Sequence, residues 1–261
     1  MNNIDTGDID AVTEVRRENN NHRFPQNELS LDDVVKLLDE SDEPVKENQN
    51  HELYPQHPFR WLVAGKSGSG KTTILLHAIF TQKIKFSKLY LYARHLDEPK
   101  YVNLMKYLNT IARENDVPLS ELLVVGDKPE DIVAVDSLDE EEQNLVLFDD
   151  FIGEKQANQG IITDYFTRGR HKNASCIYVS QSFFKVPKMI RDNCNYFSLY
   201  AIGNHATIRD IALELSLDKS SNEVVQLFKA ATADRHSFLF VDQKTLKDEL
   251  RYRKNFDEVQ G

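Results

Sequence analysis

The sequence predicts an α/β fold in which helices cover both faces of a mostly parallel central sheet. Short apolar runs recur along the chain without an alternating polar face, and helical segments lie between them. Strands of a parallel sheet are buried on both faces and therefore have continuous apolar runs, and their crossover connections are usually helices. With 261 residues, the chain is long enough for one large α/β domain or two small ones, and either could bury a sizeable core.

The expected elements can be placed in order along the chain. Strands are predicted over residues 61–64, 88–93, 122–125, 145–148, 176–180, 196–202 and 237–241, where aliphatic and aromatic residues dominate. Helices are predicted over residues 71–80, 99–114, 155–167, 204–215 and 222–231. The folded domain is therefore expected to begin near residues 51–59 and to span residues 51–261.

A phosphate-binding motif lies between the first strand and the helix that follows it. Residues 65–72 read GKSGSGKT and match the pattern GxxxxGK[ST] at every position. In such a loop, backbone N–H groups face the β- and γ-phosphates, and the positive end of the following helix adds to the attraction. The expected nucleotide-binding residues are Gly65, Lys66, Ser67, Gly68, Ser69, Gly70, Lys71, Thr72 and Thr73. The alternative is a chance match in a glycine-rich turn.

ATP and Mg²⁺ are the cofactors that this motif indicates. Lys71 would reach the phosphates as a point charge and act as a catalytic residue, and the Thr72 hydroxyl would ligate the metal. Two carboxylates follow the predicted strand 145–148, and such a strand can deliver one carboxylate to Mg²⁺ and a second to the attacking water. Asp149 fits the metal role and Asp150 the role of catalytic base. Acids in loops are common, so the pair alone is a weak indication of a nucleotide site. Together with the phosphate loop upstream it becomes a strong one.

The segment between the phosphate loop and these acids has room for an inserted strand and helix. This arrangement favours a RecA-like, P-loop NTPase fold of the additional-strand type over a small nucleotide kinase. The strand after Asp150 ends in Ser180-Gln181-Ser182, and Gln181 would lie beside the carboxylates, where it could sense the γ-phosphate or orient water. The alternative is that Gln181 caps the following helix.

Arginines are a further requirement, because charge that builds up on a transferred phosphoryl group needs a cation aimed at it. The candidates are Arg168, Arg170 and Arg191. Arg168 and Arg170 flank Gly169 at a predicted helix end, where an exposed side chain would reach the nucleotide of a neighbouring subunit. The alternative is ordinary complementation of the negative end of a helix.

The net charge of −10 does not exclude a DNA partner, because it is unevenly distributed. Residues 1–50 have a net charge of −8 and residues 127–142 a net charge of −7, so the rest of the chain is about +5. Two basic groups are candidates for sequence-independent phosphate contacts. They are Lys185, Lys188 and Arg191 beside Phe183 and Phe184, and the cluster Arg251, Arg253 and Lys254. The alternative is a solvated basic face.

Residues 1–50 are acidic and poor in aromatic residues, which predicts a largely disordered arm. Residues 29–38 could form a short amphipathic helix with Ser30 as N-cap, either for docking a partner or as a marginal local helix. The first residues, MNNIDTGDID, lack a basic start and an apolar core, so no secretory signal is expected, and no apolar run approaches the ~18 residues of a membrane span. Cys176 and Cys194 are expected to be buried and unpaired, which favours a reducing, intracellular location.

A set of motifs carries a resemblance that extends beyond the phosphate loop. In chain order they are LVAGKSGSGKT, KLYLYARHLDEPKY, LVLFDD, TRGRHKN, IYVSQSFFKVPKMIRDNCNY and RYRKNF, and they cover about residues 58–256. Together they resemble the genome-packaging ATPases of poxviruses, other large cytoplasmic DNA viruses, virophages and polinton-like elements, which belong to the FtsK-HerA superfamily of DNA pumps.

This resemblance implies a homo-oligomeric ring, a hexamer or pentamer, that hydrolyses ATP to drive double-stranded DNA into a preformed capsid. The implied partners are duplex DNA and a capsid portal or vertex protein. The implied location is the host cytoplasm or a viral factory, with association with the virion as a further option. The resemblance favours Arg170 as the intersubunit arginine. Much of the superfamily has Glu where Asp150 stands, so the water must sit closer or be positioned partly by Gln181.

Two other classes of function stay open from the residues alone. A nucleotide or small-molecule kinase could use the same loop, but it would need an acceptor-binding lid with several arginines. A scaffold could bind ATP without hydrolysing it.

Overall fold

The computed structural model of the chain describes residues 49–151, 156–215, 219–256 and 258–259. Residues 47–261 form one compact unit. The acidic arm expected over residues 1–50 and the helix expected over residues 29–38 lie outside the described residues, apart from residues 49 and 50. Both remain predictions.

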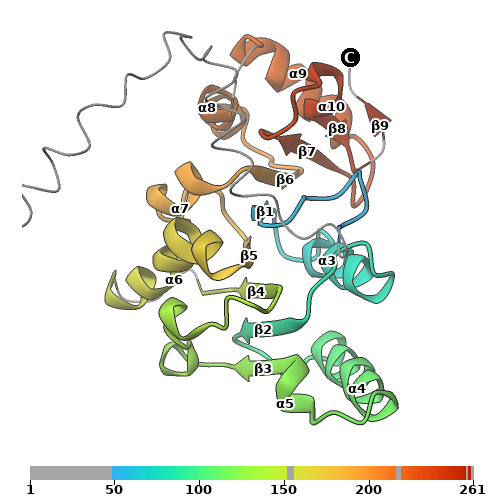
Figure 1. Cartoon of the computed structure of the whole chain (residues 1–261). Helices are drawn as coiled ribbons and strands as arrows, with labels where there is room; N and C mark the ends of the chain where they lie inside the picture. Colours follow the sequence, from blue (N-terminus) through green and yellow to red (C-terminus); the bar gives the residue numbers. More distant parts are fainter. Residues whose placement is uncertain (1–48, 152–155, 216–218, 257, 260–261) are drawn as a thin grey trace, which may run out of the picture. The chain divides into compact units, whose positions relative to one another are not determined.

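A nine-stranded mixed sheet organises the described residues, in the order β3-β2-β4-β5-β1-β6-β7-β8-β9. Its strands follow one another from the bottom to the top of Figure 1. The six parallel strands are β3 (Leu123–Gly126), β2 (Lys88–Ala93), β4 (Asn144–Asp149), β5 (Ala174–Ser180), β1 (Arg60–Ala64) and β6 (Tyr196–Tyr200). The antiparallel strands are β7 (Phe238–Asp242), β8 (Tyr252–Lys254) and β9 (Glu258–Val259). The predicted mostly parallel α/β sheet is confirmed.

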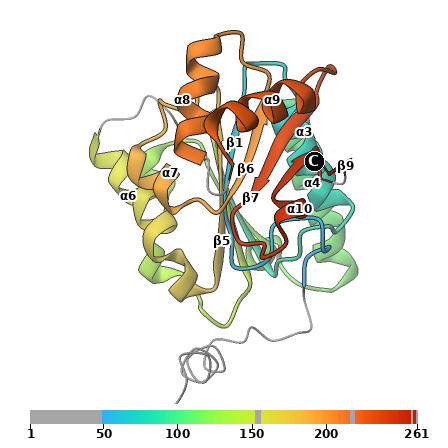
Figure 2. The same ribbon diagram turned by 90° about the horizontal axis from the view of Figure 1, so that it is seen from above.

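Helices cover both faces of this sheet (Figure 2). One face carries α3 (Lys71–Phe80) and α4 (Pro99–Glu114), and the opposite face carries α6 (Gln156–Arg168), α7 (Lys188–Asn193), α8 (His205–Leu215) and α9 (Ser221–Ala231). The short helices are α5 (Leu119–Leu122) and α10 (Asp248–Arg251). Each face has its own apolar core, because successive side chains of a strand point to opposite faces. The strands are therefore buried on both sides, as their unbroken apolar runs predicted.

Strand β5 lies between β1 and β4 in the sheet, which is the strand order of the additional-strand fold type predicted from the sequence. In register, Ala64 pairs with Ser180, and Asp149 pairs with Val179. The carboxyl ends of three parallel strands therefore meet at one edge of the sheet. Ligands of open α/β sheets bind at this edge.

The acidic segment 127–142 is not a simple linker. It forms two short 3₁₀ turns, η3 (Pro129–Asp131) and η4 (Val135–Ser137), and buries Ile132, Val135 and Leu138 against the sheet. Apolar residues at three-residue spacing anchor the segment while its acids face outward. Its charge therefore belongs to the surface of the folded unit.

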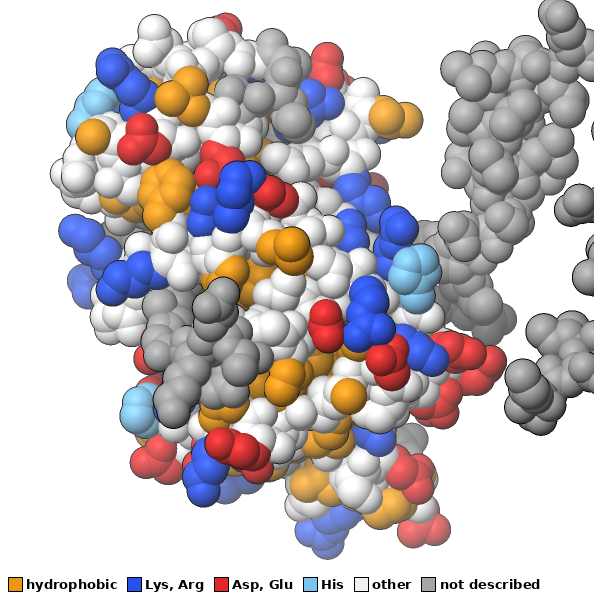
Figure 3. All heavy atoms as spheres, turned by 90° about the vertical axis from the view of Figure 1, so that its left-hand side faces the viewer, with side chains coloured by type: hydrophobic (Ala, Val, Ile, Leu, Met, Phe, Trp, Pro, Cys, Tyr) orange, Lys and Arg blue, Asp and Glu red, His pale blue; other side chains and the backbone are white. Residues whose placement is uncertain are grey.

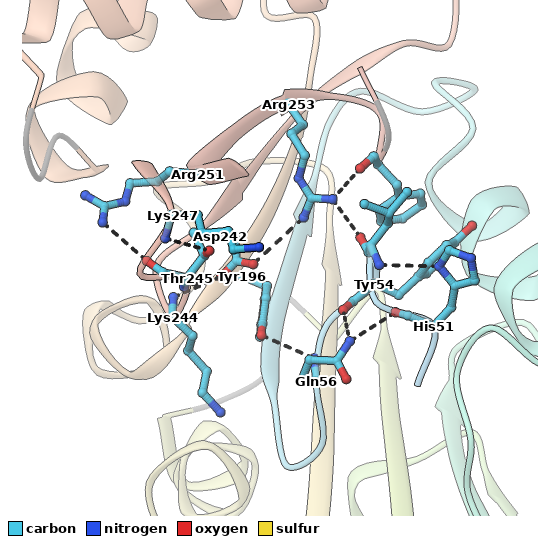
Figure 4. A network of polar contacts seen from close by, with 12 residues as sticks. His51, Tyr54, Gln56, Tyr196, Asp242, Lys244, Thr245, Lys247, Arg251 and Arg253 are labelled. Carbon is cyan, nitrogen blue, oxygen red and sulfur yellow. Dashed lines mark hydrogen bonds and ion pairs between the residues drawn. The ribbon is translucent and has the colours of Figure 1, made fainter. Parts of the chain in front are cut away.

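The carboxyl-terminal basic residues are also part of the fold, since Arg253 lies in β8 and is 2% exposed. Its guanidinium donates to the carbonyls of Leu53 (3.0 Å) and Phe256, and it pairs with Asp242 at 3.8 Å. Figure 4 shows this network, in which the loop that precedes β1 is held against the last strands. The Tyr54 and Phe256 rings stack beside it, with centroids 4.0 Å apart. These contacts tie the start of the described domain to its end.

Cys176 and Cys194 are buried and unpaired, as expected. Burial raises the pKa of the Cys176 thiol to about 12 and also raises that of Cys194. Among the described helices, none is both long enough and apolar enough to cross a membrane.

Candidate functional site

The phosphate loop leaves the carboxyl end of β1 and leads into the first turn of α3. The Gly65 N–H donates to the Ser180 carbonyl at 3.1 Å, and a Cβ at this position would lie 2.5 Å from the Cβ of Tyr200. Gly68 and Gly70 have φ values of 72° and 98°, in the left-handed region that favours glycine. The backbone conformation therefore favours glycine at two positions of the motif, and the close approach of Tyr200 favours it at Gly65.

Lys71 lies inside the loop and is 8% exposed. Its ammonium donates to the carbonyls of Gly65 at 2.7 Å and Lys66 at 2.9 Å. Burial lowers the pKa of Lys71, and the nearby Asp149 carboxylate opposes that shift. The lysine is therefore held within the cradle of backbone groups that the motif predicts for phosphates.

Two oxygen groups suited to a divalent cation converge beside this lysine. The Thr72 hydroxyl donates to Asp149 Oδ2 at 3.1 Å, which joins the start of α3 to the end of β4. Burial raises the pKa of Asp149, and a hydrogen bond from Tyr101 is the largest opposing cause. A carboxylate and a hydroxyl are hard oxygen ligands of the kind Mg²⁺ takes. Both residues fit the metal role predicted for them.

Asp150 follows β4 with a left-handed backbone, at φ 63°. Asp and Asn tolerate this conformation better than most other non-glycine residues. Its side chain is exposed at the cavity, whereas the next residue, Phe151, is fully buried. The tight turn thus places an exposed carboxylate at the cavity next to a side chain anchored in the core.

A cavity of about 300 Å³ lies between these elements. Gln181 lines it together with both carboxylates. Helix α7 begins only at Lys188 with Pro187 as its N-cap, so Gln181 is not the cap of that helix. Of the predicted nucleotide-binding residues, the cavity is lined by Ser67, Gly68, Gly70, Lys71, Thr72 and Thr73. Gly65 and Lys66 line a neighbouring cavity that also contains Gln181.

The cavity has a second wall that was not assigned from the sequence. The segment from β2 to α4 contributes Arg94, His95, Glu98, Lys100 and Tyr101. These residues belong to the motif KLYLYARHLDEPKY, which carried the family resemblance but no individual role. Their approach depends on the pairing of β2 with β4, which aligns Ala93 with Asp149.

His236 is another neighbour of the loop that the sequence did not indicate. It precedes β7 with a left-handed φ of 67°, and its Nδ1 lies 3.2 Å from the Ser69 carbonyl oxygen. The imidazole faces Gly70, where a Cβ would lie 3.5 Å from Nδ1. The antiparallel part of the sheet thus reaches the phosphate loop as well.

Arg168 and Arg170 lie away from the cavity lining described above. Arg170 belongs to η5 (Gly169–Lys172), which precedes β5, so it lies at the edge of the sheet opposite to Gln181. Arg168 pairs with Asp136 at 3.0 Å and with Asp164 at 3.1 Å. These hydrogen bonds, that of Asp136 first, raise the pKa of Arg168. Neither arginine is placed to serve the nucleotide site of its own chain.

Arg170 has a different environment from Arg168. Burial, followed by the charge of Arg170, lowers the pKa of Arg60 at the start of β1. Arg60 Nε is buried and has no hydrogen-bond partner among the described residues. Two arginines therefore lie near one another at this edge.

The structure corrects the expectation for Arg191. Its guanidinium pairs with Glu214 at 2.8 Å, donates to the Val186 carbonyl at 2.6 Å, and lies 5.2 Å from the ring centres of both Phe183 and Phe184. Only 9% of the side chain is exposed, so the guanidinium is held by these partners and is not free in solvent.

The terminal basic cluster is corrected in the same way. Arg253 is buried, Lys254 pairs with Asp234 at 2.7 Å, and Arg251 pairs with Asp248 at 3.2 Å. On the face that carries α6, α7 and α8, basic side chains lie scattered among acidic and hydrophobic ones (Figure 3). Lys185 and Lys188 are exposed there, and Lys188 pairs with Asp192. Arg253 is therefore removed as a phosphate contact, whereas Lys185 and Lys188 remain candidates on this face.

The strand order and the converging loop, carboxylates and glutamine define a phosphate-loop NTPase fold of the additional-strand type. The chain belongs to the poxvirus A32 protein family, whose sequence model matches residues 46–257. The family resemblance found in the motifs is thereby confirmed.

Curated relatives match part of the chain. The chain is 26% identical over 147 residues to the DNA packaging protein OPG160 of Variola virus and to that of Vaccinia virus (strain Copenhagen). The match covers 56% of this chain and 54% of each relative, so the chain spans about half the length of the curated relatives it matches.

Two solved structures share the fold over most of both chains. One is the genome packaging NTPase B204 from Sulfolobus turreted icosahedral virus 2 in complex with AMP, with a TM-score of 0.52 and 12% identity. That comparison covers 77% of this chain and 98% of B204. The other is B204, the DNA-packaging ATPase from Sulfolobus Turreted Icosahedral Virus, with a TM-score of 0.53, 11% identity and coverage of 78% and 99%. At such identities the likeness supports the fold alone.

Proposed function

We propose that this protein is an ATP hydrolase that packages viral or virus-like DNA. The observation that carries the proposal is the convergence of Lys71, Thr72, Asp149, Asp150 and Gln181 on one cavity at the carboxyl edge of the sheet. The loop amides and Lys71 would hold the β- and γ-phosphates, and Thr72 and Asp149 would hold Mg²⁺. Bound Mg²⁺ would neutralise charge on the phosphate oxygens. Asp150 would accept the proton of the attacking water, which Gln181 would orient.

The position of Arg170 supports an oligomeric enzyme. A cation must face the transferred phosphoryl group, and Arg170 lies at the edge of the sheet opposite to the phosphate loop and Gln181. We infer that Arg170 serves the nucleotide of the next subunit in a ring of five or six copies. Arg168 is the weaker candidate because Asp136 and Asp164 already neutralise it.

The nature of the cargo follows from family membership and from the names of the relatives. DNA packaging proteins and packaging NTPases share this sequence family or this fold, so double-stranded DNA and a capsid portal or vertex protein are the proposed partners. Free, buried cysteines fit a reducing location, and we propose the host cytoplasm or a viral factory, with association with the virion during packaging.

The proposal is tested by measuring ATP hydrolysis with and without duplex DNA. Wild type should hydrolyse ATP faster when DNA is present, whereas Lys71→Ala and Asp150→Asn should lose turnover. Asp116→Asn is a matched control for Asp150→Asn, since Asp116 is exposed and also has a positive φ, of 55°, and does not line the cavity. Phosphoryl transfer to a nucleoside without DNA would indicate a kinase instead. ATP binding without any turnover would indicate a scaffold.

A further inference from the structure

The segment between β2 and α4 brings a buried tyrosine to the predicted metal site. Strand β2 pairs in parallel with β4, so the segment leaves the sheet at the edge where Asp149 lies. Helix α4 begins at Pro99, which places Tyr101 in its first turn. Tyr101 is 1% exposed and packs in the core beneath α3 and α4. Its ring position is therefore fixed by packing.

The Tyr101 hydroxyl donates a hydrogen bond to Asp149 Oδ2. The Thr72 hydroxyl donates to the same oxygen at 3.1 Å. Because both bonds end on Oδ2, they leave Oδ1 to ligate a cation. A rigid donor on one carboxylate oxygen selects the side-chain rotamer and so orients the other oxygen.

Lys100 lies next to Tyr101 in the same segment, and its positive charge lies near the carboxylates of Glu98 and Asp149. Its ammonium pairs with Glu98 at 2.8 Å and lies 3.4 Å from Thr72 Oγ1 and 4.0 Å from Asp149 Oδ2. It also lies 4.9 Å from the centre of the Tyr101 ring. The tyrosine therefore has neighbours on both sides that restrict its movement.

We propose that Tyr101 is a positioning residue that orients the Asp149 carboxylate for Mg²⁺ in the nucleotide complex. This inference rests on the proposed function, because it concerns the metal of the same site. Hydrogen bonds from outside the coordination sphere orient metal ligands, and their loss typically costs 10- to 100-fold in metal affinity. Tyr101 would act on the metal through the residues that hold it, chiefly Asp149 and also Thr72, with which its hydroxyl has a side-chain hydrogen bond.

The test uses the full chain and a fluorescent, non-hydrolysable ATP analogue. Binding is titrated against Mg²⁺ for wild type, Tyr101→Phe and Tyr107→Phe, and the analogue affinity is also measured in EDTA. Tyr107 is the matched control, since it lies on the same helix, is half-buried, and is absent from the cavity lining. Tyr101→Phe keeps the packed ring and removes only the hydroxyl.

We expect Tyr101→Phe to raise the Mg²⁺ midpoint about 10-fold or more, with unchanged affinity in EDTA, and Tyr107→Phe to leave both unchanged. A shift below about threefold, or an equal loss of affinity in EDTA, would overturn the positioning role. Asp149→Asn separates this failure from failure of the proposed function. If wild type binds the analogue independently of Mg²⁺ and Asp149→Asn changes nothing, both proposals fall. If Asp149→Asn abolishes the Mg²⁺ dependence and Tyr101→Phe does not alter it, only the role of Tyr101 falls.

Discussion

The backbone N–H of Gly65 donates to the carbonyl of Ser180 at 3.1 Å, so the first residue of the phosphate loop is hydrogen-bonded to the end of the inserted strand. On its other side, Gly65 faces Tyr200, which is 2% exposed. The loop is thus enclosed by β5 and β6, the two strands that flank β1. Its shape depends on the packing of both neighbours.

Gly65→Ala should destabilise the protein and weaken nucleotide binding. The new methyl group would lie 2.5 Å from Tyr200 Cβ, and overpacking of this kind costs about 1–3 kcal/mol. Thermal unfolding and nucleotide titration measure both effects. The control is Gly160→Ala in α6, where a Cβ meets nothing within 4 Å and the change should stabilise the helix by about 0.5–1 kcal/mol. Equal unfolding temperatures for the two variants would contradict the enclosed loop.

Asp150→Asn should fold normally while losing turnover by about 10²–10⁴-fold, the range of a general base. Asn tolerates the left-handed backbone at φ 63° but accepts no proton. Asp150→Glu should restore a carboxylate yet unfold at a lower temperature than wild type, since a longer side chain is less tolerant of this backbone. Turnover and thermal unfolding are measured for wild type, Asp150→Asn and Asp150→Glu. Turnover reports the need for a carboxylate, and the unfolding temperature reports the need for a residue that tolerates the left-handed backbone. Full activity and stability of the Glu variant would show that the turn imposes no preference.

Mixing experiments test the intersubunit role of Arg170. Arg170→Ala subunits keep an intact phosphate loop, and Lys71→Ala subunits keep the arginine, so a mixture should hydrolyse ATP faster than either variant alone. Mixing Arg170→Ala with the Lys71→Ala, Arg170→Ala double variant should give no such gain. Arginine fingers contribute about 10³–10⁵-fold to turnover, so even partial recovery is measurable. Absence of recovery would assign Arg170 a structural role.

Arg191→Ala should destabilise the protein by on the order of 3 kcal/mol, because it leaves Glu214 and the Val186 carbonyl without their partner. Lys188→Ala on the same helix removes an exposed pair with Asp192 and should cost less than about 1 kcal/mol. Denaturant unfolding provides both values. The salt dependence of DNA binding should not change in Arg191→Ala, and a smaller slope would show that Arg191 does contact phosphates.

Cys176 and Cys194 should resist thiol reagents at neutral pH in the folded protein. Burial raises the pKa of Cys176 to about 12, so the reactive thiolate is scarce as well as inaccessible. Labelling should become rapid in denaturant, where the pKa returns to its ordinary range. Measuring the labelling rate with and without nucleotide would report how strongly the ligand stabilises the fold. Rapid labelling of the native protein would contradict the burial of both thiols.

The local motifs predicted much of the site, and topology explains why. The GKSGSGKT loop is contiguous in sequence, and the parallel order of β4, β5 and β1 brings Asp149 and Gln181 to it. Tyr101 and Lys100 were not predicted, because their approach depends on the register of β2 against β4, which a single sequence does not reveal. Arg253 was misassigned because its carbonyl partners, Leu53 and Phe256, come from opposite ends of the domain. From the sequence alone, three basic residues close together in the chain indicate a surface cluster, because the partners that bury Arg253 are not visible.

Strand β5 links the two edges of the sheet at which Gln181 and Arg170 lie. It is buried along all seven residues, with Gln181 following one end and η5, which contains Arg170, preceding the other. A strand of this length is a stiff rod of roughly 20 Å. If Arg170 serves the next subunit, a displacement of Gln181 on hydrolysis would shift the arginine offered to that neighbour. The order in which neighbouring subunits of a ring hydrolyse ATP would then depend on this one strand, without a separate signalling domain.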